Sequence, residues 1–586
     1  MPSRIRLIVA LLFALLLGAA PVAAQLAQAA PEAATGRNDK PLQRAKTHMV
    51  AAANPLATAA GLEMLNAGGS AADAAIAVQL VLNLVEPQSS GLGGGAYLLH
   101  WDAKGDTLLT YDGRETAPMA ATPDRFLRDG KPIPYDRAVH SGLSIGTPGT
   151  PRLLEAVHKA HGRLPWAQLF EPALKLAVHG FPISPRLHLL LQLMGPANFD
   201  QTARSYFFDH AGVPHPVGHL LANPAFAATL EALRDGGADA FYGGPIAAAI
   251  VAAAAAAPNH PGDLSLADIA GYRVELRSPV CVTYRGHRVC GMGPSSSGGL
   301  AVAQTLRLLE GQDLGRGPAA ALDPQALHKI AEAEKLAFAD RNRYVGDPAF
   351  VRIPPGMLDA GYLTSRGRLI DPAAAMPQPA AGRPPGIDSR LPGLDTTRES
   401  VGTSHVSIVD RGGNAVSMTT TIEAAFGARV MAAGFLLNNE LTDFAFTPTD
   451  AEGRMLANAV APAKRPRSSM SPTLIFDPAG RLMAVVGSPG GSRIIPYVVK
   501  AIIALIDWEL DAQAAAAMTN FGSRGGPFEI ESDAGFPTDT IIAELRRLGH
   551  AIVSDPLTSG LHIIRVRADH LEGGADPRRE GTAAGD

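Results

Sequence analysis

The chain has 586 residues, of which 46% are hydrophobic, so it can bury a sizeable core in one large domain or in several smaller ones. Charged residues make up 18%, below the roughly 25% that is usual for soluble domains, and the formal net charge is −4. This balance provides no basic field that would attract nucleic acid, and it favours a small-molecule partner.

The first residues have the composition of a secretory signal peptide. Arg4 and Arg6 precede an apolar run over residues 7–17, and small residues follow at 22–24. Basic, apolar and small-residue regions in this order are typical of a cleaved export signal. The alternative is a membrane anchor, but the run is shorter than the ~20 apolar residues of a spanning helix. We therefore expect residues 1–24 to be removed, and the protein to be periplasmic or extracellular without a membrane anchor.

Ala and Leu recur at helical spacing in two stretches of the chain. Residues 49–85 predict two helices separated by a turn at Gly68-Gly69, and ALHKIAEAEKLAFADRNRY predicts a third helix over 324–343. The two chain ends lack such spacing. Residues 30–44 and the polar segment from Ala568 onward predict loose termini.

Cys281 and Cys290, the two cysteines of the chain, stand in the sequence CVTYRGHRVC. A two-residue turn at 285–286 would place Tyr284 opposite His287 and Cys281 opposite Cys290. In that register the cysteines form a non-hydrogen-bonded pair, where antiparallel strands approach most closely. The geometry permits a cross-strand disulfide, and export to an oxidising compartment favours one. Two free thiols in a hairpin are an equal alternative.

A segment of changed composition precedes a predicted sheet. Prolines and glycines among polar residues over 373–402 predict a mobile linker. Directly after it, TSHVSIVD, a turn at RGGN and AVSMTTT predict a β-hairpin over 403–421. A second hairpin is predicted over 471–487, followed by an apolar helix over 493–508. Sheet structure therefore begins abruptly where the linker ends.

Thr403 stands at this junction and is a candidate nucleophile. A threonine at the start of a chain offers a hydroxyl nucleophile and, on the same residue, an α-amino group with a pKa of about 7.7–8.0 to act as base. A strand that follows directly on a linker suggests a cut between Gly402 and Thr403. Taken alone, a threonine at a strand start is far more often a β-forming residue. The hypothesis therefore depends on the surrounding motifs.

Several motifs follow Thr403 in a fixed order, and others precede it. Those that follow are TTTIEAAFG, FLLNNELTDF, KRPRSSMSPT and GSPGGSR; those that precede are NAGGSAADAAIAVQLVLNLVEPQSSGLGGGAYLL, YDGRETAP, PSSSGG and AEAEKLAFADRNRYVGDP. Together they cover nearly the whole chain after the leader. In this series the chain resembles the gamma-glutamyltranspeptidases, which are N-terminal nucleophile hydrolases. The resemblance implies an α+β fold, the four-layer αββα sandwich of that class.

The resemblance also implies the catalytic residues. It makes Thr403 the nucleophile and places Thr421 beside it as a supporting hydroxyl. Gly490 and Gly491 match the positions of the oxyanion hole. The residues themselves agree with this role, because two glycines ahead of an apolar helix expose backbone N–H groups at the positive end of the helix. A plain glycine-rich turn is the alternative for these glycines.

A γ-glutamyl group ends in an α-amino group and an α-carboxylate, so its pocket needs groups of both charges. Arg114 matches the carboxylate-binding arginine of the family, and its planar fork suits that task. Ser468 and Ser469 match its hydroxyl partners. Glu440 and Asp443 match the groups that hold the substrate amine. Without the resemblance, these charged residues would be assigned to the solvated surface.

The chain departs from the family pattern at two places. Glu423 stands where well-known members have an asparagine, and a third carboxylate can strengthen amine binding or raise the pKa of a neighbour. Residues 447–467 include no aromatic residue, whereas many transpeptidases carry one on a longer lid loop there. Relatives in which this lid loop is reduced include enzymes that act on cephalosporin side chains.

Three other features predict structure rather than chemistry. The glycine-rich sequence GLGGG at 91–95 lacks the strand and helix context of a nucleotide-binding loop, so a packing turn is the better interpretation. His405 is interpreted as a core or capping histidine, and Ser295 to Ser297 lack the surroundings of a serine nucleophile. The histidines show no metal-ligand spacing, so neither a metal nor a cofactor is expected.

These observations predict an autoprocessing enzyme. The chain would divide into a large subunit, residues 25–402, and a small catalytic subunit, residues 403–586, and would transfer γ-glutamyl groups from donors such as glutathione to water, amino acids or dipeptides. One alternative is a cephalosporin or glutaryl acylase, which differs in whether the substrate must carry an α-amino group. The other is an exported binding protein without catalysis, which would keep the pocket but not the chain cut.

Overall fold

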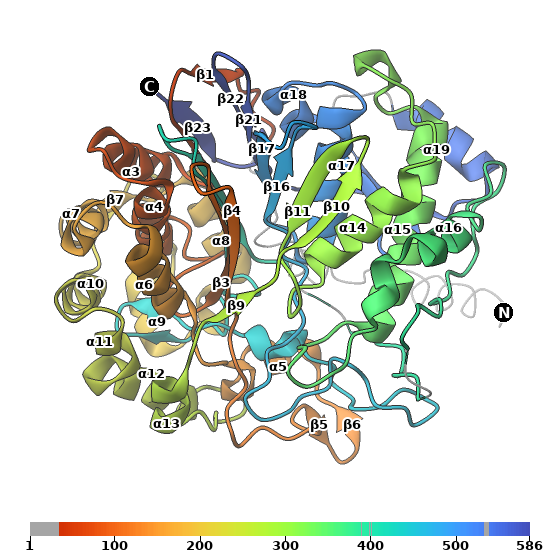
Figure 1. The fold of residues 1–586 in the computed structure, drawn as a ribbon. Helices are drawn as coiled ribbons and strands as arrows, with labels where there is room; N and C mark the ends of the chain where they lie inside the picture. Colours follow the sequence, from red (N-terminus) through yellow and green to blue (C-terminus); the bar gives the residue numbers. More distant parts are fainter. Residues whose placement is uncertain (1–33, 35, 388–389, 398, 400, 533–537) are drawn as a thin grey trace, which may run out of the picture.

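The computed structural model describes residue 34 and residues 36–387, 390–397, 399, 401–532 and 538–586 (Figure 1). The predicted signal peptide, residues 1–24, lies outside the described residues. Within the described part of the chain, no helix combines the length and the apolar character needed to cross a membrane.

Two seven-stranded antiparallel sheets form the centre of the described chain. The first sheet has the order β23 (Thr582–Gly585), β2 (Met49–Ala52), β12 (Ser404–Val409), β13 (Ala415–Thr421), β3 (Gly95–Asp102), β4 (Thr107–Gly113), β9 (Glu275–Arg277). The second has the order β1 (Gln43–Ala45), β22 (Leu571–Ala575), β21 (His562–Val566), β17 (Leu482–Gly487), β16 (Thr473–Phe476), β11 (His287–Gly291), β10 (Val280–Tyr284).

Helices cover the outer face of each sheet (Figure 1). On the side of the first sheet lie α3 (Pro55–Asn66), α4 (Ala71–Val85), α6 (Thr150–His161), α7 (Glu171–His179), α8 (Pro185–Met194), α9 (Gln201–Phe207), α10 (Pro224–Gly236), α11 (Asp239–Tyr242) and α12 (Gly244–Ala255). On the side of the second lie α14 (Gly298–Leu309), α15 (Pro324–Tyr344), α16 (Ala360–Gly367), α17 (Ile494–Ile506), α18 (Ala512–Ala517) and α19 (Thr538–Arg547). Between the sheets, β12 and β13 contact β17. These four layers confirm the predicted αββα sandwich.

The remaining elements lie at the edges of this sandwich. They are α5 (Tyr135–Val139), α13 (Leu266–Gly271), the paired strands β5 (Leu127–Arg128) and β6 (Lys131–Pro132), β7 (Phe181–Pro182) and β8 (Leu220–Leu221), β14 (Met431–Ala432) and β15 (Phe435–Leu436), and a small sheet of β18 (Phe521–Ser523), β19 (Phe528–Glu531) and β20 (Ile552–Asp555). Short 3₁₀ helices include η6 (Glu440–Asp443) and η7 (Gly491–Arg493).

Most predicted elements are confirmed. α15 covers the helix predicted over 324–343 and begins with Pro324 in the first turn, behind an Asp323 side chain that accepts from two backbone N–H groups. The hairpin β12/β13 turns at Asp410 to Asn414 as predicted, and β16/β17 form the second hairpin. Helix α17 follows it, as the apolar run over 493–508 predicted.

The predicted helix at the start of 49–85 is wrong at its first residues. Met49–Ala52 forms β2, a buried strand between β12 and β23, and α3 begins only after Asn54, whose side chain caps the helix. A strand buried on both faces is apolar at every position, so its composition does not distinguish it from a helix.

The predicted loose chain ends are also wrong for the described residues. The last residues form β22 and β23, and β1 pairs with β22. Lys40 Nζ donates to the carbonyls of Asp576 and Arg579, at 2.8 and 2.7 Å. The two ends of the chain, far apart in sequence, therefore contact and stabilise one another. Local composition cannot reveal such a contact.

The cysteine hairpin has the predicted register. Cys281 lies opposite Cys290 in β10/β11, with Cα atoms 4.1 Å apart, and the structure joins the two sulfur atoms in a disulfide. Arg285 and Gly286 both have positive φ, 50° and 80°, as a two-residue turn between twisted strands requires. Of the two alternatives, a disulfide or two free thiols, the structure therefore has the disulfide.

The described part of 373–402 contains no regular helix or strand. Several of its residues are nevertheless held in place: Gly382 N donates to Asp340, and Asp395 is buried. The mobility of this segment stays a prediction.

Candidate active site

The peptide bond between Gly402 and Thr403 lies directly before β12, in the middle of the first sheet. Thr403 is buried, and the register of β12 and β13 places Thr421 level with it. The Thr421 hydroxyl donates to the carbonyl oxygen of Gly402, and the Thr421 Oγ1 accepts from the backbone N–H of Glu423 at 2.8 Å. A hydroxyl held in this way polarises the carbonyl group that a nucleophile on Thr403 would attack.

Gly402 is required by close packing. A Cβ atom at this position would lie 1.9 Å from the carbonyl oxygen of Glu423, a distance that no side chain can occupy. Gly94, in the predicted packing turn, is restricted in the same way, since its Cβ would lie 2.0 Å from the Thr421 carbonyl oxygen. Gly402 and Gly94 thus allow three backbone segments to meet at the predicted cleavage point.

Gly490 directly precedes η7 and Gly491 is its first residue, so both glycines lie ahead of α17. Both have positive φ, 142° and 55°, which favours glycine. Gly491 lines the pocket that also contains Thr403. This location fits the predicted oxyanion role, because the start of a helix presents backbone N–H groups to a developing negative charge.

One pocket brings the predicted residues together. Its lining residues are Arg114, Glu399, Gly402, Thr403, Thr421, Glu423, Glu440, Asp443, Ser468, Ser469, Met470, Gly491 and Ile494. Of the predicted site residues only Gly490 is absent from this lining, and it adjoins Gly491. The sequence interpretation did not include Glu399, Met470 or Ile494.

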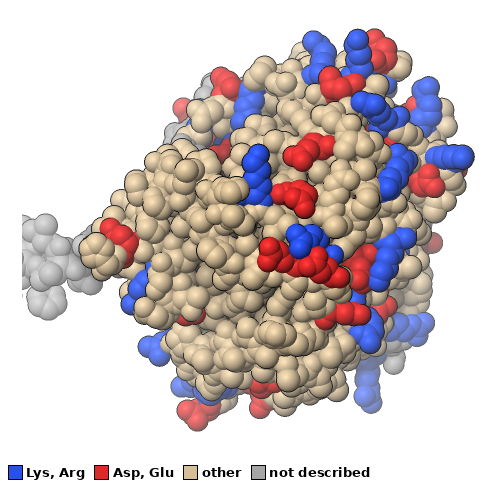
Figure 2. Space-filling model, turned by 90° about the vertical axis from the view of Figure 1, so that its left-hand side faces the viewer, with Lys and Arg blue, Asp and Glu red and all other residues tan. Residues whose placement is uncertain are grey.

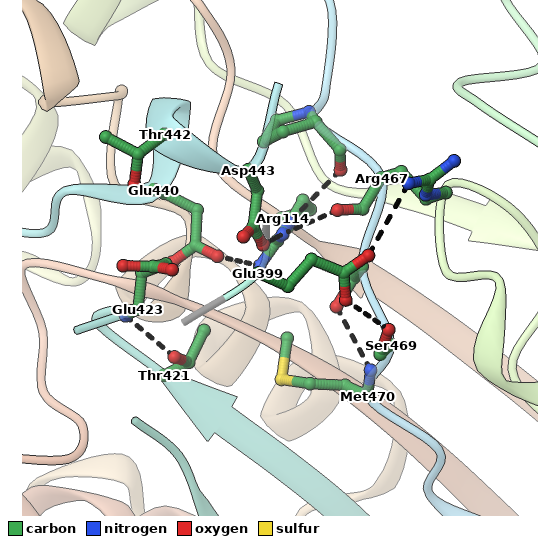
Figure 3. A network of polar contacts seen from close by, with 12 residues as sticks. Arg114, Glu399, Thr421, Glu423, Glu440, Thr442, Asp443, Arg467, Ser469 and Met470 are labelled. Atoms are coloured by element: carbon green, nitrogen blue, oxygen red, sulfur yellow. Dashed lines mark hydrogen bonds and ion pairs between the residues drawn. The ribbon is translucent and has the colours of Figure 1, made fainter. Parts of the chain in front are cut away.

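Arg114, which follows β4, binds both acidic residues of η6 (Figure 3). Its Nη1 donates to Glu440 and its Nη2 to Asp443. Nη2 also donates to the Arg467 carbonyl at 3.0 Å, and Nε to the Pro466 carbonyl at 3.2 Å. Four of the five guanidinium N–H groups of Arg114 therefore have protein partners in the uncleaved chain. The guanidinium group is not free to bind a substrate carboxylate with two N–H groups in this state.

Carboxyl groups are crowded around this single arginine. Burial raises the pKa of Glu115 to about 7 and that of Asp443 to about 8, although the Arg114 charge opposes both shifts. Burial also raises the pKa of Glu440, and the neighbouring Glu115 and Glu423 add to this shift. The pocket thus has an excess of acidic groups, which suits a cationic ligand group.

We expect the raised pKa of Glu115 to make the uncleaved chain less stable as pH rises. Between pH 4.5 and 7 the folded chain holds a proton that the unfolded chain has lost, so the free energy of unfolding falls through this window. Glu115→Gln, made in a Thr403→Ala chain, should reduce this fall by about 3 kcal/mol. Urea unfolding at pH 4.5 and pH 8 measures the difference. The exposed Glu63→Gln should follow the parent, and an equal slope for Glu115→Gln would show that Glu115 is ionised throughout.

Glu423, the departure from the family pattern, faces the pocket from a strained backbone position with φ of 76°. It accepts from Asn439 Nδ2 and, at 3.3 Å, from the hydroxyl of Tyr135. Asn439 Oδ1 in turn accepts from the N–H of Ala424 at 2.8 Å. The carboxylate is therefore fixed in place, close enough to raise the pKa of Glu440.

The serines 295–297, set aside as nucleophiles, support the segment that contains Ser468 and Ser469, the predicted substrate-binding serines. Ser297 donates from its N–H and its hydroxyl to the Ser468 carbonyl, at 2.8 and 2.6 Å. Ser296 Oγ donates to the Met470 carbonyl at 2.6 Å. These bonds hold the chain around Ser469 against α14.

Glu399 lines the pocket and binds Arg341 and Arg467, and the sequence interpretation missed all three of these residues. Ser469 Oγ contacts Glu399 at 2.5 Å and Arg341 Nη2 at 2.7 Å. Arg341 belongs to the quoted motif AEAEKLAFADRNRYVGDP, but helical spacing alone indicated only packing. Glu399 lies in a segment predicted to be mobile, and no local pattern indicated that its side chain enters the pocket.

His405 is confirmed as a core histidine. It is buried, with Nδ1 2.8 Å from Thr419 Oγ1 and Nε2 3.0 Å from Ser407 Oγ. Burial, with a smaller contribution from His562, lowers its pKa far below the ordinary value, so the ring is neutral. It does not line the pocket beside Thr403.

Among the described residues, His328, Glu332 and His550 offer ligand atoms within 4.8 Å of one another. His328 Nδ1 instead shares a hydrogen bond with His550 Nε2 at 2.7 Å, and Glu332 accepts from Lys335 Nζ at 2.8 Å. These atoms already have protein partners, so we assign no metal to this cluster.

Known proteins are similar to this chain in both sequence and fold. The gamma-glutamyltranspeptidase family model matches residues 57–586. The chain is 36% identical over 544 residues to a glutathione hydrolase proenzyme of Escherichia coli (strain K12), covering 91% of each protein. It is 34% identical over 555 residues to a glutathione hydrolase proenzyme of Bacillus subtilis (strain 168), covering 92% of each.

A solved structure with the same fold is that of cephalosporin acylase from Bacillus halodurans. Its TM-score is 0.81 at 27% identity, and the match covers 94% of this chain and 98% of that one. The family model spans most of the chain, including every residue of the pocket beside Thr403. The chain therefore belongs to the gamma-glutamyltranspeptidase family and is an enzyme of the N-terminal nucleophile hydrolase class.

Proposed function

We propose that the chain is a proenzyme that cuts itself between Gly402 and Thr403 and then uses Thr403 to cleave γ-glutamyl amides such as glutathione. The observation that carries the proposal is the hydrogen bond from Thr421 to the Gly402 carbonyl, in a pocket that also contains Arg114 and acidic side chains. The names of the proenzyme relatives support the same activity.

In the processing step, the Thr403 hydroxyl attacks the Gly402 carbonyl carbon while Thr421 polarises the carbonyl oxygen. The C–N bond breaks as the nitrogen takes a proton, which leaves an ester between Gly402 and Thr403. Water then hydrolyses this ester. The products are a large subunit that ends in the Gly402 carboxylate and a small subunit, 403–586, that begins with the free amine of Thr403.

In turnover, the Thr403 hydroxyl attacks the γ-carbonyl carbon of the donor and its α-amine takes the proton. Backbone N–H groups at Gly490 and Gly491 stabilise the oxyanion, each contributing about 3 kcal/mol. The leaving amine departs with the proton, and water or the amine of an amino acid or dipeptide releases the glutamyl group from Thr403. No step requires a cofactor.

The charges of the pocket favour a donor with an α-amino group. By the family pattern Glu440 and Asp443, with Glu423 beside them, would hold that amine, and Arg114, Ser468 and Ser469 the α-carboxylate; all six residues line this pocket. A glutaryl donor lacks the amine and would offer these acids no cationic group to bind. Similarity to a cephalosporin acylase keeps acylase activity as the second candidate, and its test is cleavage of a glutaryl anilide.

Residues 1–24 have the composition of an export signal, so we assign the enzyme to the periplasm or the exterior. Its donors and acceptors would then be small molecules outside the cytoplasm. On the face that α3, α7 and α10 cover, acidic and basic side chains are interspersed and form no single basic area (Figure 2).

We expect this enzyme to favour hydrolysis over transfer more than relatives with an aromatic lid do. An aromatic lid would shield the acyl-enzyme from water, whereas residues 447–467 include no aromatic side chain and Met455 is 56% exposed. Steady-state kinetics on a γ-glutamyl anilide, with and without saturating glycylglycine, test both the activity and this ratio. Absence of γ-glutamyl release would overturn the proposed function. A dominant transfer product near neutral pH would instead show that this loop covers the site by other means.

A further inference from the structure

The turn between β17 and α17 contains two glycines and depends on its neighbours for its shape. Gly490 and Gly491 carry no side chains that could fix their orientation, and glycine loses more conformational freedom on ordering than any other residue. Within the turn, the N–H of Arg493 donates to the Gly490 carbonyl at 3.0 Å. On the β17 side, Ser488 Oγ accepts from the N–H of Gly560 at 3.3 Å. These bonds alone leave the α17 side of the turn to be held by other groups.

An ion-pair network holds that side, the residues that follow Gly491. Arg524 Nη1 donates to Ser492 Oγ at 2.8 Å. Arg524 also binds Glu529, through Nε at 3.3 Å and through Nη2. Glu529 in turn accepts from Arg493 Nε at 2.9 Å. Two of the three residues of η7 are therefore bonded to one arginine–carboxylate pair.

This pair belongs to a hairpin that is itself fixed in the fold. Arg524 directly follows β18, and Glu529 lies in β19, which pairs with β18. Phe528 of β19 is buried, and the N–H of Ser523 in β18 donates to the buried Glu334 of α15 at 2.6 Å. The hairpin thus presents Arg524 and Glu529 to η7 from a rigid support.

The network is charged and partly shielded from water. Burial alone would raise the pKa of Glu529, but the charges of Arg524 and Arg493 lower it below its ordinary value, so the group is a carboxylate at neutral pH. The side chain of Glu529 is 12% exposed and that of Arg524 30%. All three residues lie outside the lining of the pocket beside Thr403. Their influence on the reaction would therefore pass through the backbone of η7.

We propose that Arg524 and Glu529 are positioning residues that orient the backbone N–H groups at the start of η7 toward the oxyanion. These N–H groups belong to Gly490 and Gly491. The inference rests on the proposed function, in which the oxyanion forms on the γ-carbonyl oxygen when Thr403 attacks. Donors that are already oriented stabilise the developing charge without reorganising during the reaction. Loosening them should slow the chemical steps and leave donor binding almost unchanged.

Arg524→Met tests this role because it removes every donor and keeps the length of the side chain. In the cleaved enzyme it should lower kcat for a γ-glutamyl anilide roughly 10- to 100-fold, up to the loss expected when one oxyanion donor is removed. Acylation and deacylation both pass through a tetrahedral oxyanion, so kcat falls whichever step is slower. Glu529→Gln should act in the same direction. Arg524→Lys should recover part of the loss, since one ammonium group cannot reproduce the bonds to both Ser492 and Glu529.

Two inhibitors separate positioning from a general effect on the pocket. L-Glutamate resembles the bound γ-glutamyl group, whereas an analogue with a boronic acid in place of the γ-carbonyl group bonds to the Thr403 oxygen as a tetrahedral anion. Arg524→Met should raise the inhibition constant of the boronic acid by about the factor by which it lowers kcat. The inhibition constant of L-glutamate should change by less than about threefold, since ground-state binding does not use the oxyanion donors.

The matched control is Arg285→Met. Arg285 also lies at a hairpin, is 26% exposed, and binds the carboxylate of Asp507 through Nε at 3.0 Å. It does not line the pocket beside Thr403. Per mole of cleaved enzyme, this variant should match the parent in kcat and in both inhibition constants.

The proposed function and the positioning role fail in different ways. If the parent enzyme releases no γ-glutamyl group from the anilide, the proposed function itself fails. If the parent is active but Arg524→Met leaves kcat unchanged, or weakens L-glutamate as much as the boronic acid, the positioning role is overturned. If Arg524→Met does not fold or process, Arg524→Lys and Glu529→Gln, checked for processing on a denaturing gel, decide by the same ratio between the two inhibitors.

Discussion

A Thr403→Ala chain should remain a single polypeptide, with no detectable large and small subunits on a denaturing gel. The substitution removes the hydroxyl that, in the proposed reaction, attacks the Gly402 carbonyl, while Thr421 keeps its hydrogen bond to that carbonyl. Since no other hydroxyl takes this position in the proposed reaction, the loss of processing should be complete. N-terminal sequencing of the smaller fragment of the parent enzyme checks the cleavage point and should begin at Thr403.

The matched control is Thr473→Ala. Thr473 is also a buried threonine on a sheet strand, and its hydroxyl bonds the Ser471 carbonyl at 3.0 Å, outside the pocket. This variant should process normally. A small subunit that begins at Thr396, Thr397 or any residue other than Thr403 would contradict the assignment, and so would cleavage of the Thr403→Ala chain.

The sequence predicted the hairpins in the middle of the sandwich better than the strands that lie near the two ends of the chain. Period-two patterns and turn residues located β12/β13 and β16/β17, because each hairpin forms from residues close together in the chain. β22 pairs with the nearby β21 but was mistaken for a loose tail, because its sequence LEGGA lacks the apolar alternation of a strand. β2 was mistaken for helix, and β23 for a loose tail, because they pair with each other across hundreds of residues. Pairing over that distance leaves no local pattern.

The candidate site was likewise predicted from local motifs and missed where distant segments meet. Motifs around Thr403 and Arg114 led to residues that line one pocket. The ion pairs of Glu399 were missed, because they join a proline-rich segment, the end of a long helix and a loop. The bonds of the Arg114 guanidinium group to Glu440 and Asp443 were also missed, since residue types alone do not show which neighbour a guanidinium group binds.

Arg114→Lys should weaken donor use although the charge is kept. Arg114 binds Glu440 and Asp443 with separate nitrogens and also donates to the Pro466 and Arg467 carbonyls, a planar arrangement that one ammonium group cannot reproduce. The acidic groups would then shift, and the donor would lose its partner. We expect a loss on the order of 2–5 kcal/mol in transition-state binding, measured as kcat/KM for a γ-glutamyl anilide.

Processing of Arg114→Lys should be spared, because the bonds of Arg114 go to Glu440, Asp443 and two carbonyls rather than to the peptide that is cut. The matched control is Arg125→Lys. Arg125 is also buried, binds Asp263 through both Nη atoms at 2.8 and 2.6 Å, and does not line the pocket. Its variant should lose stability without a comparable loss of kcat/KM. Unchanged kcat/KM for Arg114→Lys would remove Arg114 from donor binding, and equal losses in both variants would point to a general effect on the fold.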